Sequence, residues 1–261
     1  MSRCQVIQLR LFDRDPVPPA VMALVERGAL FVVNHSGGKD SQAMLIELLR
    51  YVPREQLLIV HAELPGVEWE GTQEHILATS SGLPMIVAKA VRTFFDMVEA
   101  RGRFPSASQR QCTSDLKRGP IQREVRRYLK ANPRFGGLVV NCMGMRAAES
   151  AKRSQLSPFT FSAANSKAGR EWYDFLPVYD LSEAEVFASI AGAGQEPHWV
   201  YGRGMTRKSC RFCIMASAAD LRTAATIAPD AYRHIVAVER RLNFTLSMSG
   251  RTLPEITGIA A

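Results

Sequence analysis

The sequence lacks a long apolar segment. Hydrophobic residues make up 46% of its 261 positions. They fall in short runs, and none approaches the ~18 consecutive apolar residues typical of a membrane-spanning helix. The first fifteen residues carry charges where an export signal would have its apolar core. We therefore expect a cytoplasmic protein with no membrane contact, long enough for one large domain or two small ones.

Cysteine is scarce, and its number is odd. The chain has five cysteines. Without an export signal, this favours reduced thiols for metal binding or catalysis over a disulfide framework. Cys210 and Cys213 form a C-x-x-C pair, Cys112 is the next candidate ligand, and Cys142 follows an apolar run. Cys4 is expected to be an ordinary thiol. A C-x-x-C pair alone is a weak metal signal, because zinc and iron–sulfur clusters take three or four ligands.

Acidic residues are nearly absent from residues 101–134. Ten lysines and arginines lie there against Asp115 and Glu124, so this segment carries +8, which equals the net charge of the whole chain. Such a field would attract a polyanion, either nucleotide phosphates or nucleic acid. The alternative is a helix with a solvated basic face. After Pro120, apolar residues recur at helical spacing: Ile121, Val125, Tyr128 and Leu129.

Short apolar runs alternate with helical patterns along the chain. Strands are predicted at 29–35, 56–64, 83–90 and 137–146. Helices are predicted at 40–52, 68–82, 93–102 and 181–194. This alternation indicates an α/β fold, in which helices cover both faces of a parallel sheet. Ligands of such sheets bind at the carboxyl ends of the strands, so the loops after Val33, Leu64 and Cys142 should share one crevice.

Two regions do not follow the alternation. Residues 157–172 are small, polar and unpatterned, which predicts a loop or lid. Residues from about 203 onward are expected to form a separate C-terminal subregion with helices.

Residues 34–41 read NHSGGKDS and connect the first predicted strand to the first predicted helix. Gly37 and Gly38 carry no side chains, so backbone N–H groups there can approach a phosphate closely. Lys39 adds a positive charge, and a helix that begins near Asp40 directs its positive end toward the same point. The spacing fits neither the Walker pattern GxxxxGK nor GxGxxG. The alternative is a tight turn that holds no ligand.

The loop SGGKDS resembles the pyrophosphatase loop (PP loop) of the adenine-nucleotide alpha-hydrolase superfamily. Four further segments resemble, in chain order, motifs of that superfamily's phosphoadenylyl-sulfate (PAPS) reductase family: HAELPGVEWEGTQEH, GMRAAESAKR, PVYDLSEAEVF and YGRGMTRKSCRFC. The five segments cover about residues 30–215. The resemblance implies a Rossmann-like (HUP-type) parallel sheet with helices on both faces. It also implies three regions: an N-terminal extension at 1–28, a PP-loop nucleotide-binding domain at 29–202, and a small helical, cysteine-containing subregion at 203–261.

The resemblance implies a site for an adenine nucleotide, either ATP or PAPS or adenylyl sulfate (APS), with Mg²⁺. The residues that it implies around the phosphates are Ser36, Gly37, Gly38, Lys39, Asp40 and Ser41. Lys39 and Arg146 are the expected catalytic residues, because they would stabilise charge on a leaving pyrophosphate. Asp40 would orient the loop or hold Mg²⁺, with a helix cap as the alternative. Glu63 stands where the family usually has an aspartate and is expected near the nucleotide or the metal. Further phosphate contacts, with surface arginines as the alternative, are expected from Arg153 and Arg207.

The resemblance also gives the cysteines a role. In iron–sulfur members of the family, a cysteine before a lysine-containing helix joins a downstream C-x-x-C pair. This implies a [4Fe–4S] cluster on Cys112, Cys210 and Cys213, with structural zinc or free core cysteines as the alternatives. Either Cys142 or an open iron would complete the cluster, and the alternative for Cys142 is a small buried strand residue. Gln111 precedes Cys112, where the family pattern for APS reduction has a second cysteine.

The sequence departs from the family's reductases after Cys213, because no further cysteine follows. Those reductases carry a nucleophilic cysteine in a C-terminal Glu-Cys-Gly-x-His motif, which forms a thiosulfonate intermediate. We therefore expect cleavage of ATP to AMP and pyrophosphate, which activates a substrate for sulfur transfer from a sulfur donor. One alternative is a PAPS or APS reductase that releases sulfite with a thiol carrier. The other is an accessory subunit that binds nucleotide, or nucleic acid through residues 101–134, without turnover.

Overall fold

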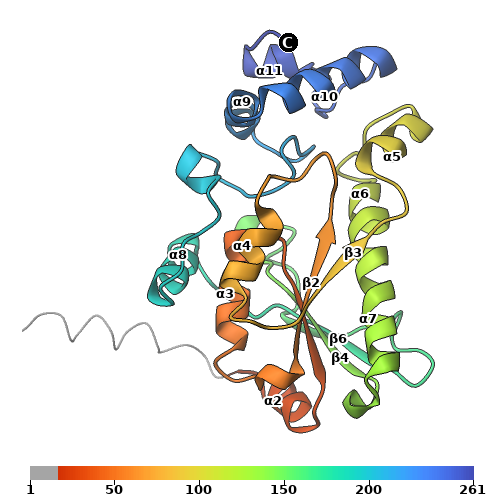
Figure 1. Ribbon diagram of the computed structural model, residues 1–261, viewed down its shortest axis with the longest axis vertical. Helices are drawn as coiled ribbons and strands as arrows, with labels where there is room; N and C mark the ends of the chain where they lie inside the picture. Colours follow the sequence, from red (N-terminus) through yellow and green to blue (C-terminus); the bar gives the residue numbers. More distant parts are fainter. Residues whose placement is uncertain (1–16) are drawn as a thin grey trace, which may run out of the picture.

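The computed structural model describes residues 17–261 (Figure 1). Cys4 and residues 1–16 of the predicted N-terminal extension lie outside the described residues. The chain enters the fold through helix α2 (Pro19–Glu26), which packs Val21 and Leu24 into the core. Among residues 17–261, no helix has the length and apolar character needed to cross a membrane.

A six-stranded sheet forms the centre of the fold, in the order β3-β2-β1-β4-β6-β5. Its strands are β1 (Leu30–Asn34), β2 (Leu57–Glu63), β3 (Met85–Lys89), β4 (Leu138–Met143), β5 (Phe159–Phe161) and β6 (Glu171–Phe175). All neighbouring pairs are parallel except β5 and β6. The predicted α/β fold with a parallel sheet is confirmed, and the four predicted strands correspond to β1, β2, β3 and β4.

The prediction of a loop or lid at 157–172 is wrong in part. β5 and the start of β6 lie within this segment. Phe159 pairs with Phe175 across the two strands, and its ring stacks on Tyr173 with 5.4 Å between ring centroids. Because β5 spans only Phe159–Phe161, its local pattern is too short to reveal a strand that is stabilised by its neighbour.

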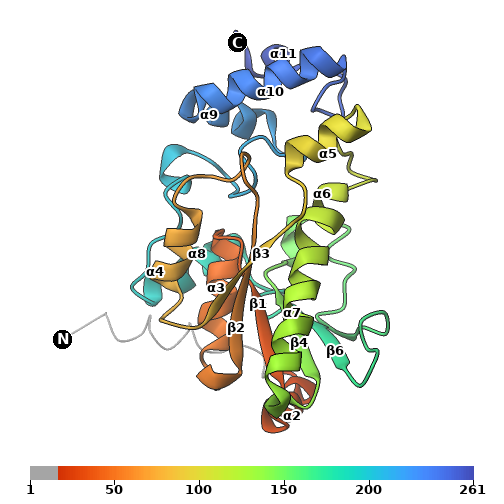
Figure 2. The same ribbon diagram turned by 45° about the vertical axis from the view of Figure 1, so that its right-hand side comes forward.

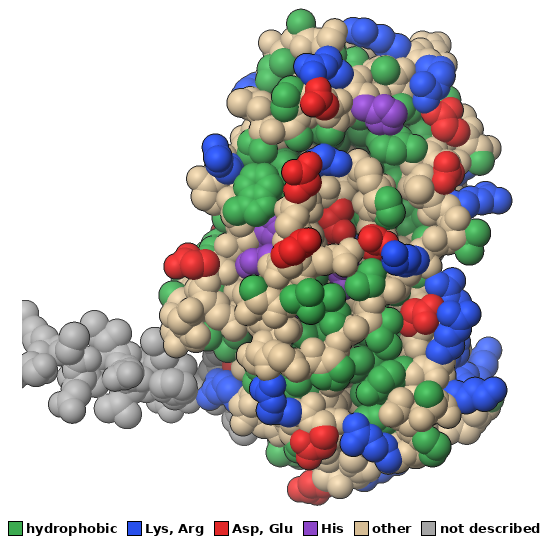
Figure 3. Space-filling model, viewed as in Figure 1, with side chains coloured by type: hydrophobic (Ala, Val, Ile, Leu, Met, Phe, Trp, Pro, Cys, Tyr) green, Lys and Arg blue, Asp and Glu red, His purple; other side chains and the backbone are tan. Residues whose placement is uncertain are grey.

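Helices cover both faces of the sheet, as the predicted fold class requires (Figures 1 and 2). The first face is covered by α2, α3 (Lys39–Leu48), α4 (Thr72–Thr79) and α8 (Glu183–Gly192). On the second face, α7 (Gly119–Ala131) packs Val125 and Leu129 against the sheet. Arg126, Arg127 and Lys130 are exposed on the outside of α7, and basic side chains gather along this side of the molecule (Figure 3). The predicted amphipathic character of this helix is confirmed.

The central strand β1 is buried on both faces. Residues Leu30, Phe31, Val32 and Val33 have no exposed surface. Phe31 and Val33 pack with the helices of the first face, whereas Leu30 and Val32 pack on the α7 side. Burial on both sides explains why this strand is continuously apolar.

The C-terminal helices lie beyond the carboxyl ends of the strands (Figure 2). They are α9 (Ala218–Ile227), α10 (Pro229–Leu242) and α11 (Leu253–Thr257). Together with α5 (Phe94–Arg101), they form a hydrophobic core that also includes Leu64, Val67 and Trp69 from the β2–α4 connection. Between α5 and α7 the chain forms α6 (Gln111–Thr113) and a π-helical turn, Ser114–Arg118. The helical C-terminal subregion is confirmed, and the domain boundary at 203 stays a prediction.

Candidate functional site

A cavity of about 650 Å³ lies at the carboxyl ends of β1, β2 and β4. Its walls come from the ends of these strands, from the loops that follow them, and from residues 201–215. Ser36, Glu68 and Met145 all line it, so the crevice predicted for the loops after these three strands is confirmed.

The loop at the end of β1 is closed by its own hydrogen bonds. The backbone N–H of Ser36 donates to Ser41 Oγ at 3.2 Å, and Ser41 Oγ donates to the carbonyl oxygen of Gly38 at 2.8 Å. Gly37 has a positive φ of 77°. A Cβ atom on Gly37 would lie 3.0 Å from both Lys208 Nζ and Thr72 Cγ2. Conformation and close packing therefore both favour glycine at this position.

The two predicted catalytic cations meet at Asp40. Lys39 Nζ lies 3.0 Å from Asp40 Oδ2 and 3.3 Å from Glu183 Oε1. Arg146 Nε lies 2.6 Å from Asp40 Oδ1, and its Nη1 donates to the carbonyl oxygen of Leu181 at 3.1 Å. Both cations are at least 95% buried. Asp40 therefore neutralises two buried charges that come from distant parts of the sequence.

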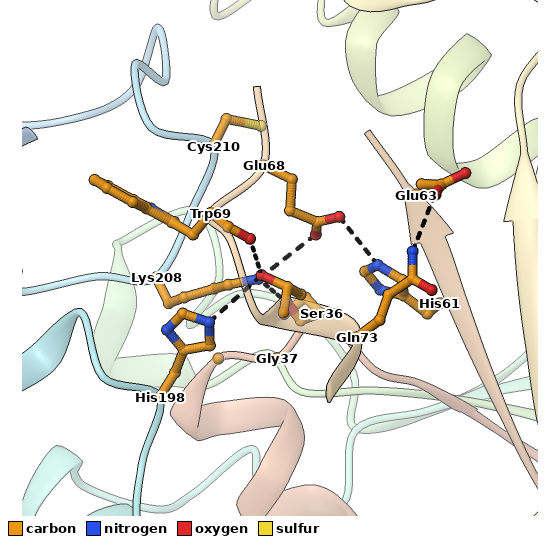
Figure 4. Close-up of polar contacts among 12 residues, drawn as sticks. Ser36, Gly37, His61, Glu63, Glu68, Trp69, Gln73, His198, Lys208 and Cys210 are labelled. Carbon is orange, nitrogen blue, oxygen red and sulfur yellow. Dashed lines mark hydrogen bonds and ion pairs between the residues drawn. The ribbon is translucent and has the colours of Figure 1, made fainter. Parts of the chain in front are cut away.

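Lys208 and Tyr201 hold the loop from the C-terminal side, and the sequence reasoning missed both. The backbone N–H groups of Lys39 and Lys208 donate to Tyr201 Oη at 3.0 and 3.3 Å. The ammonium group of Lys208 donates to the carbonyl oxygen of Ser36 and lies 3.6 Å from Glu68 Oε1 (Figure 4). Burial lowers the pKa of Lys208 to about 8, although Glu68 opposes the shift. Lys208 is two residues from Cys210, but no spacing pattern indicates that it reaches the loop.

Glu68 connects Lys208 to His61 of β2 through polar contacts. Its Oε2 lies 3.2 Å from His61 Nε2, and His61 Nδ1 lies 2.9 Å from the carbonyl oxygen of His35. Burial disfavours ionisation of Glu68, but the hydrogen bond with His61 and the charge of Lys208 outweigh it, so the pKa of Glu68 is lowered. A continuous polar chain therefore joins the start of the phosphate loop, residues 36–41 that the sequence predicts to hold phosphates, to the segment that carries the C-x-x-C pair.

Two buried histidines lie beside the loop. His35 Nδ1 accepts a hydrogen bond from the backbone N–H of Gly37 at 3.1 Å, and His198 Nε2 lies 3.4 Å from Thr72 Oγ1. Burial, reinforced by the nearby charge of Lys208, lowers the pKa of both His35 and His198 to about 3. Both rings are therefore neutral near pH 7.

Three of the candidate cysteine ligands come together. Cys112, Cys210 and Cys213 line the cavity, and their proximity raises the pKa of Lys117, with Cys210 as the largest cause. In the described part of the chain, Lys117 makes no ion pair with a carboxylate. No group of three or more histidine, cysteine, aspartate or glutamate side chains in residues 17–261 is arranged to hold a metal ion.

The fourth cysteine candidate lies elsewhere. Cys142 pairs with Val33 in the sheet and belongs to the hydrophobic core of the first face. It is fully buried, and burial raises the pKa of its thiol well above the usual value. The structure therefore separates Cys142 from the three cysteines at the cavity and supports the alternative of a small buried strand residue.

Of the remaining predicted site residues, the two arginines line the cavity and Glu63 does not. Arg153 and Arg207 line the cavity together with Arg110, and Arg153 forms an ion pair with Glu149. Burial and the nearby charge of Arg207 lower the pKa of Arg153. Glu63 instead accepts a hydrogen bond from Gln73 at 3.0 Å and pairs with Lys89 at 3.2 Å, and it is not one of the residues that line the cavity.

A parallel sheet with a glycine-rich loop between β1 and α3 defines a class, the Rossmann-like α/β proteins. Within this class, the family model for the phosphoadenosine phosphosulfate reductase domain matches residues 31–216. This match covers more than half of the chain. The chain therefore belongs to the PAPS reductase domain family, as its motifs predicted.

Individual relatives are distant. An uncharacterized 37.8 kDa protein in the gpa 5′ region of Escherichia phage 186 is 28% identical over 128 residues, which cover 49% of this chain and 36% of that protein. Candida glabrata FMN adenylyltransferase in complex with FAD and pyrophosphate is 13% identical, with a TM-score of 0.44, over 70% of this chain and 54% of that one. Candida auris PAPS reductase is 12% identical, with a TM-score of 0.45, over 80% and 96%. This chain therefore spans about a third of the phage protein and about half of the adenylyltransferase.

The hydroxyl group of Tyr201 should stabilise the phosphate loop. In a Tyr201→Phe variant the N–H groups of Lys39 and Lys208 lose their acceptor, so the free energy of unfolding should fall by about 1–3 kcal/mol. Urea denaturation measures this change. Tyr128→Phe is the matched control, because the Tyr128 hydroxyl makes no hydrogen bond among the described residues. Equal stability of the two variants would contradict the role of Tyr201.

The buried histidines should make the protein sensitive to acid. The pKa values of His35 and His198 are near 3 in the folded chain and ~6.5 when unfolded. The unfolded state therefore binds more protons below pH 6.5. Their contribution to stability is complete above that pH and is lost as the pH falls toward 3, by about 1.4 kcal/mol per pH unit for each histidine. Urea denaturation from pH 7.5 to 4.5 should show a smaller slope for His198→Gln than for the unchanged protein, and equal slopes would contradict this.

Proposed function

We propose that this chain binds ATP in the cavity, cleaves it to AMP and pyrophosphate, and thereby activates a substrate oxygen for replacement by sulfur. The observation that carries the proposal is that the phosphate loop and three cysteines line the same cavity. A protein that only binds a nucleotide does not need thiols beside the phosphates, whereas sulfur transfer to an activated group requires both within reach of one substrate.

The first step would be an attack of the substrate oxygen on the α-phosphorus of ATP. A new bond forms between that oxygen and phosphorus, and the bond to pyrophosphate breaks. Asp40 would hold Mg²⁺ together with phosphate oxygens, and Lys39, released from this carboxylate, would join Arg146 in stabilising charge on the pyrophosphate. A sulfur donor would then displace AMP from the activated substrate. Lys39 and Asp40 line the cavity, and Arg146, which is not among the lining residues, contacts the other oxygen of Asp40.

Cys112, Cys210 and Cys213 would hold a [4Fe–4S] cluster with one open iron, since Cys142 lies in the core of the sheet. When bound, such a cluster would supply an iron site for sulfur. Lys117 supports an anionic group at this position, because this half-buried cation lies beside the cysteines and makes no ion pair with a carboxylate in residues 17–261. Structural zinc on the same three cysteines is the alternative, and within the described residues no group of three ligands is arranged to hold a metal ion.

The alternative of a PAPS or APS reductase has less support. Its chemistry needs a nucleophilic thiol, and the chain has no cysteine after Cys213. Cys142 is fully buried, so it cannot substitute without a rearrangement of the sheet. Either Cys4, which lies outside the described residues, or a thiol carrier would then have to supply the nucleophile. Release of sulfite from PAPS in the presence of thioredoxin would favour this alternative.

The accessory-subunit alternative depends on residues 101–134. Arg110 and Lys117 of this segment line the cavity, whereas Arg126 and Arg127 are exposed on α7. Binding of nucleic acid that weakens with salt, without any release of pyrophosphate, would favour this alternative.

Replacement of Lys39 tests the proposed ATP cleavage. Lys39→Ala should reduce the release of pyrophosphate from ATP by about 100- to 1,000-fold, because charge on the leaving group is no longer stabilised. A coupled pyrophosphate assay measures this rate in the presence of Mg²⁺. Lys130→Ala, on the exposed face of α7, removes the same charge far from the loop and should leave the rate unchanged. Undiminished turnover in Lys39→Ala would contradict the proposal.

Metal content tests the role of the thiols. Protein purified without oxygen should contain iron and absorb visible light as iron–sulfur proteins do. Cys112→Ser should lose most of the iron, whereas Cys142→Ala should retain it, because Cys142 lies in the sheet core. Iron and zinc counting with ultraviolet–visible spectra distinguishes these results. A colourless protein without iron, or loss of iron in Cys142→Ala alone, would contradict this assignment.

A further inference from the structure

Three polar side chains cross the sheet on its α7 face, near the carboxyl ends of β1, β4 and β6. Asn34 Nδ2 donates to Asn141 Oδ1 at 2.7 Å, and Asn141 Nδ2 donates to Asp174 Oδ1 at 2.7 Å. The preceding residues on the same face are apolar and belong to the core beneath α7: Val32, Val139 and Trp172. The face thus changes from apolar to polar where the strands reach the cavity.

The hydrogen bonds fix which way the two amide groups point. A carboxylate can only accept, so Asp174 requires Asn141 to present its NH₂ group, which turns Asn141 Oδ1 toward Asn34. The carbonyl oxygen of Cys142 also can only accept, and it lies 2.8 Å from Asn34 Nδ2. Two independent acceptors therefore hold the NH₂ group of Asn34, and its Oδ1 is left facing away from both.

This remaining oxygen belongs to a residue of the cavity wall. Asn34 lines the cavity. In the described part of the chain, Asn34 Oδ1 accepts no hydrogen bond. It is also absent from the polar atoms that are fully buried without a partner, so this oxygen is accessible from the cavity side. Apolar residues line the cavity on the same side: Val60, which is paired with Asn34 in the sheet, and Ile121 of α7. The phosphate loop begins two residues after Asn34 and lines the same cavity, so a nucleotide bound at the loop could place its nucleoside against this wall.

We propose that Asn34 Oδ1 determines nucleoside specificity by accepting a hydrogen bond from the bound nucleotide. Its partner is a donor of the nucleoside, either the 6-amino group of adenine or a ribose hydroxyl group. Asn141 and Asp174 are positioning residues that keep this acceptor turned toward the cavity. The inference rests on the proposed nucleotide site and adds to it a reason for discrimination between nucleotides.

Four ligands separate the two donors from each other and from the phosphates. ITP has an oxygen in place of the 6-amino group, 2′-deoxy-ATP and 3′-deoxy-ATP each lack one hydroxyl group, and inorganic triphosphate has no nucleoside. Dissociation constants for these and for ATP are measured by calorimetry with Asn34→Leu, which removes the acceptor. Asn34→Ala removes it with less steric change and is used if Asn34→Leu does not fold. Asn132→Leu is the matched control, because Asn132 donates to the carbonyl oxygen of Tyr128 outside the cavity.

The unchanged protein should bind one of the three analogues about tenfold more weakly than ATP, as expected for one lost hydrogen bond. The Asn34 variant should bind ATP and that analogue alike, with unchanged affinity for inorganic triphosphate, and Asn132→Leu should behave as the unchanged protein. Discrimination that persists in the Asn34 variant, or an equal loss for all ligands including triphosphate, would overturn the proposal. An unchanged protein that binds inorganic triphosphate but no ATP, or neither, would instead refute the nucleotide site itself.

Discussion

The site depends on the neutralisation of the cations that are buried around the phosphate loop. Lys39 and Arg146 share the carboxylate of Asp40, and Lys208 lies against Glu68. A buried charge is costly unless it is paired and hydrogen-bonded. Each pair with Arg146 or Lys208 joins parts of the chain that are far apart in sequence. The same contacts therefore hold the loop in place and bring β2, β4 and the cysteine-containing segment to one cavity.

Local patterns were sufficient to predict the framework of the fold. The apolar run of β1, the glycines of the loop and the periodicity of α7 each act within a few residues, so the sequence reveals them. Cys142 shows where local reasoning ends, because its position near the end of a strand does not tell which face it occupies. Its register against Val33 directs it into the core. The contacts of Lys208 and Tyr201 with the loop arise only when distant segments pack, and no spacing in the sequence indicates them.

The cavity combines elements that the chain carries in separate segments. The phosphate loop follows β1, Arg153 follows β4, and two of the three clustered cysteines belong to the segment after α8. Glu63 is an instructive exception, because it ends β2 at the expected edge of the sheet but pairs with Lys89 on the neighbouring strand. Position at the carboxyl end of a strand is therefore not sufficient for a place in this site.

The shared core of the C-terminal helices has a consequence for the order of folding during synthesis. Leu64 and Trp69 emerge from the ribosome early, yet they pack with helices that begin at Ala218. The phosphate loop likewise reaches its final contacts only after Tyr201 and Lys208 have been synthesised. Because a ribosome builds the chain from its N-terminus, the sheet can form before either partner exists. A nascent chain halted before residue 201 would thus have the loop without its contacts to Tyr201 and Lys208. The complete cavity is therefore among the last features to assemble.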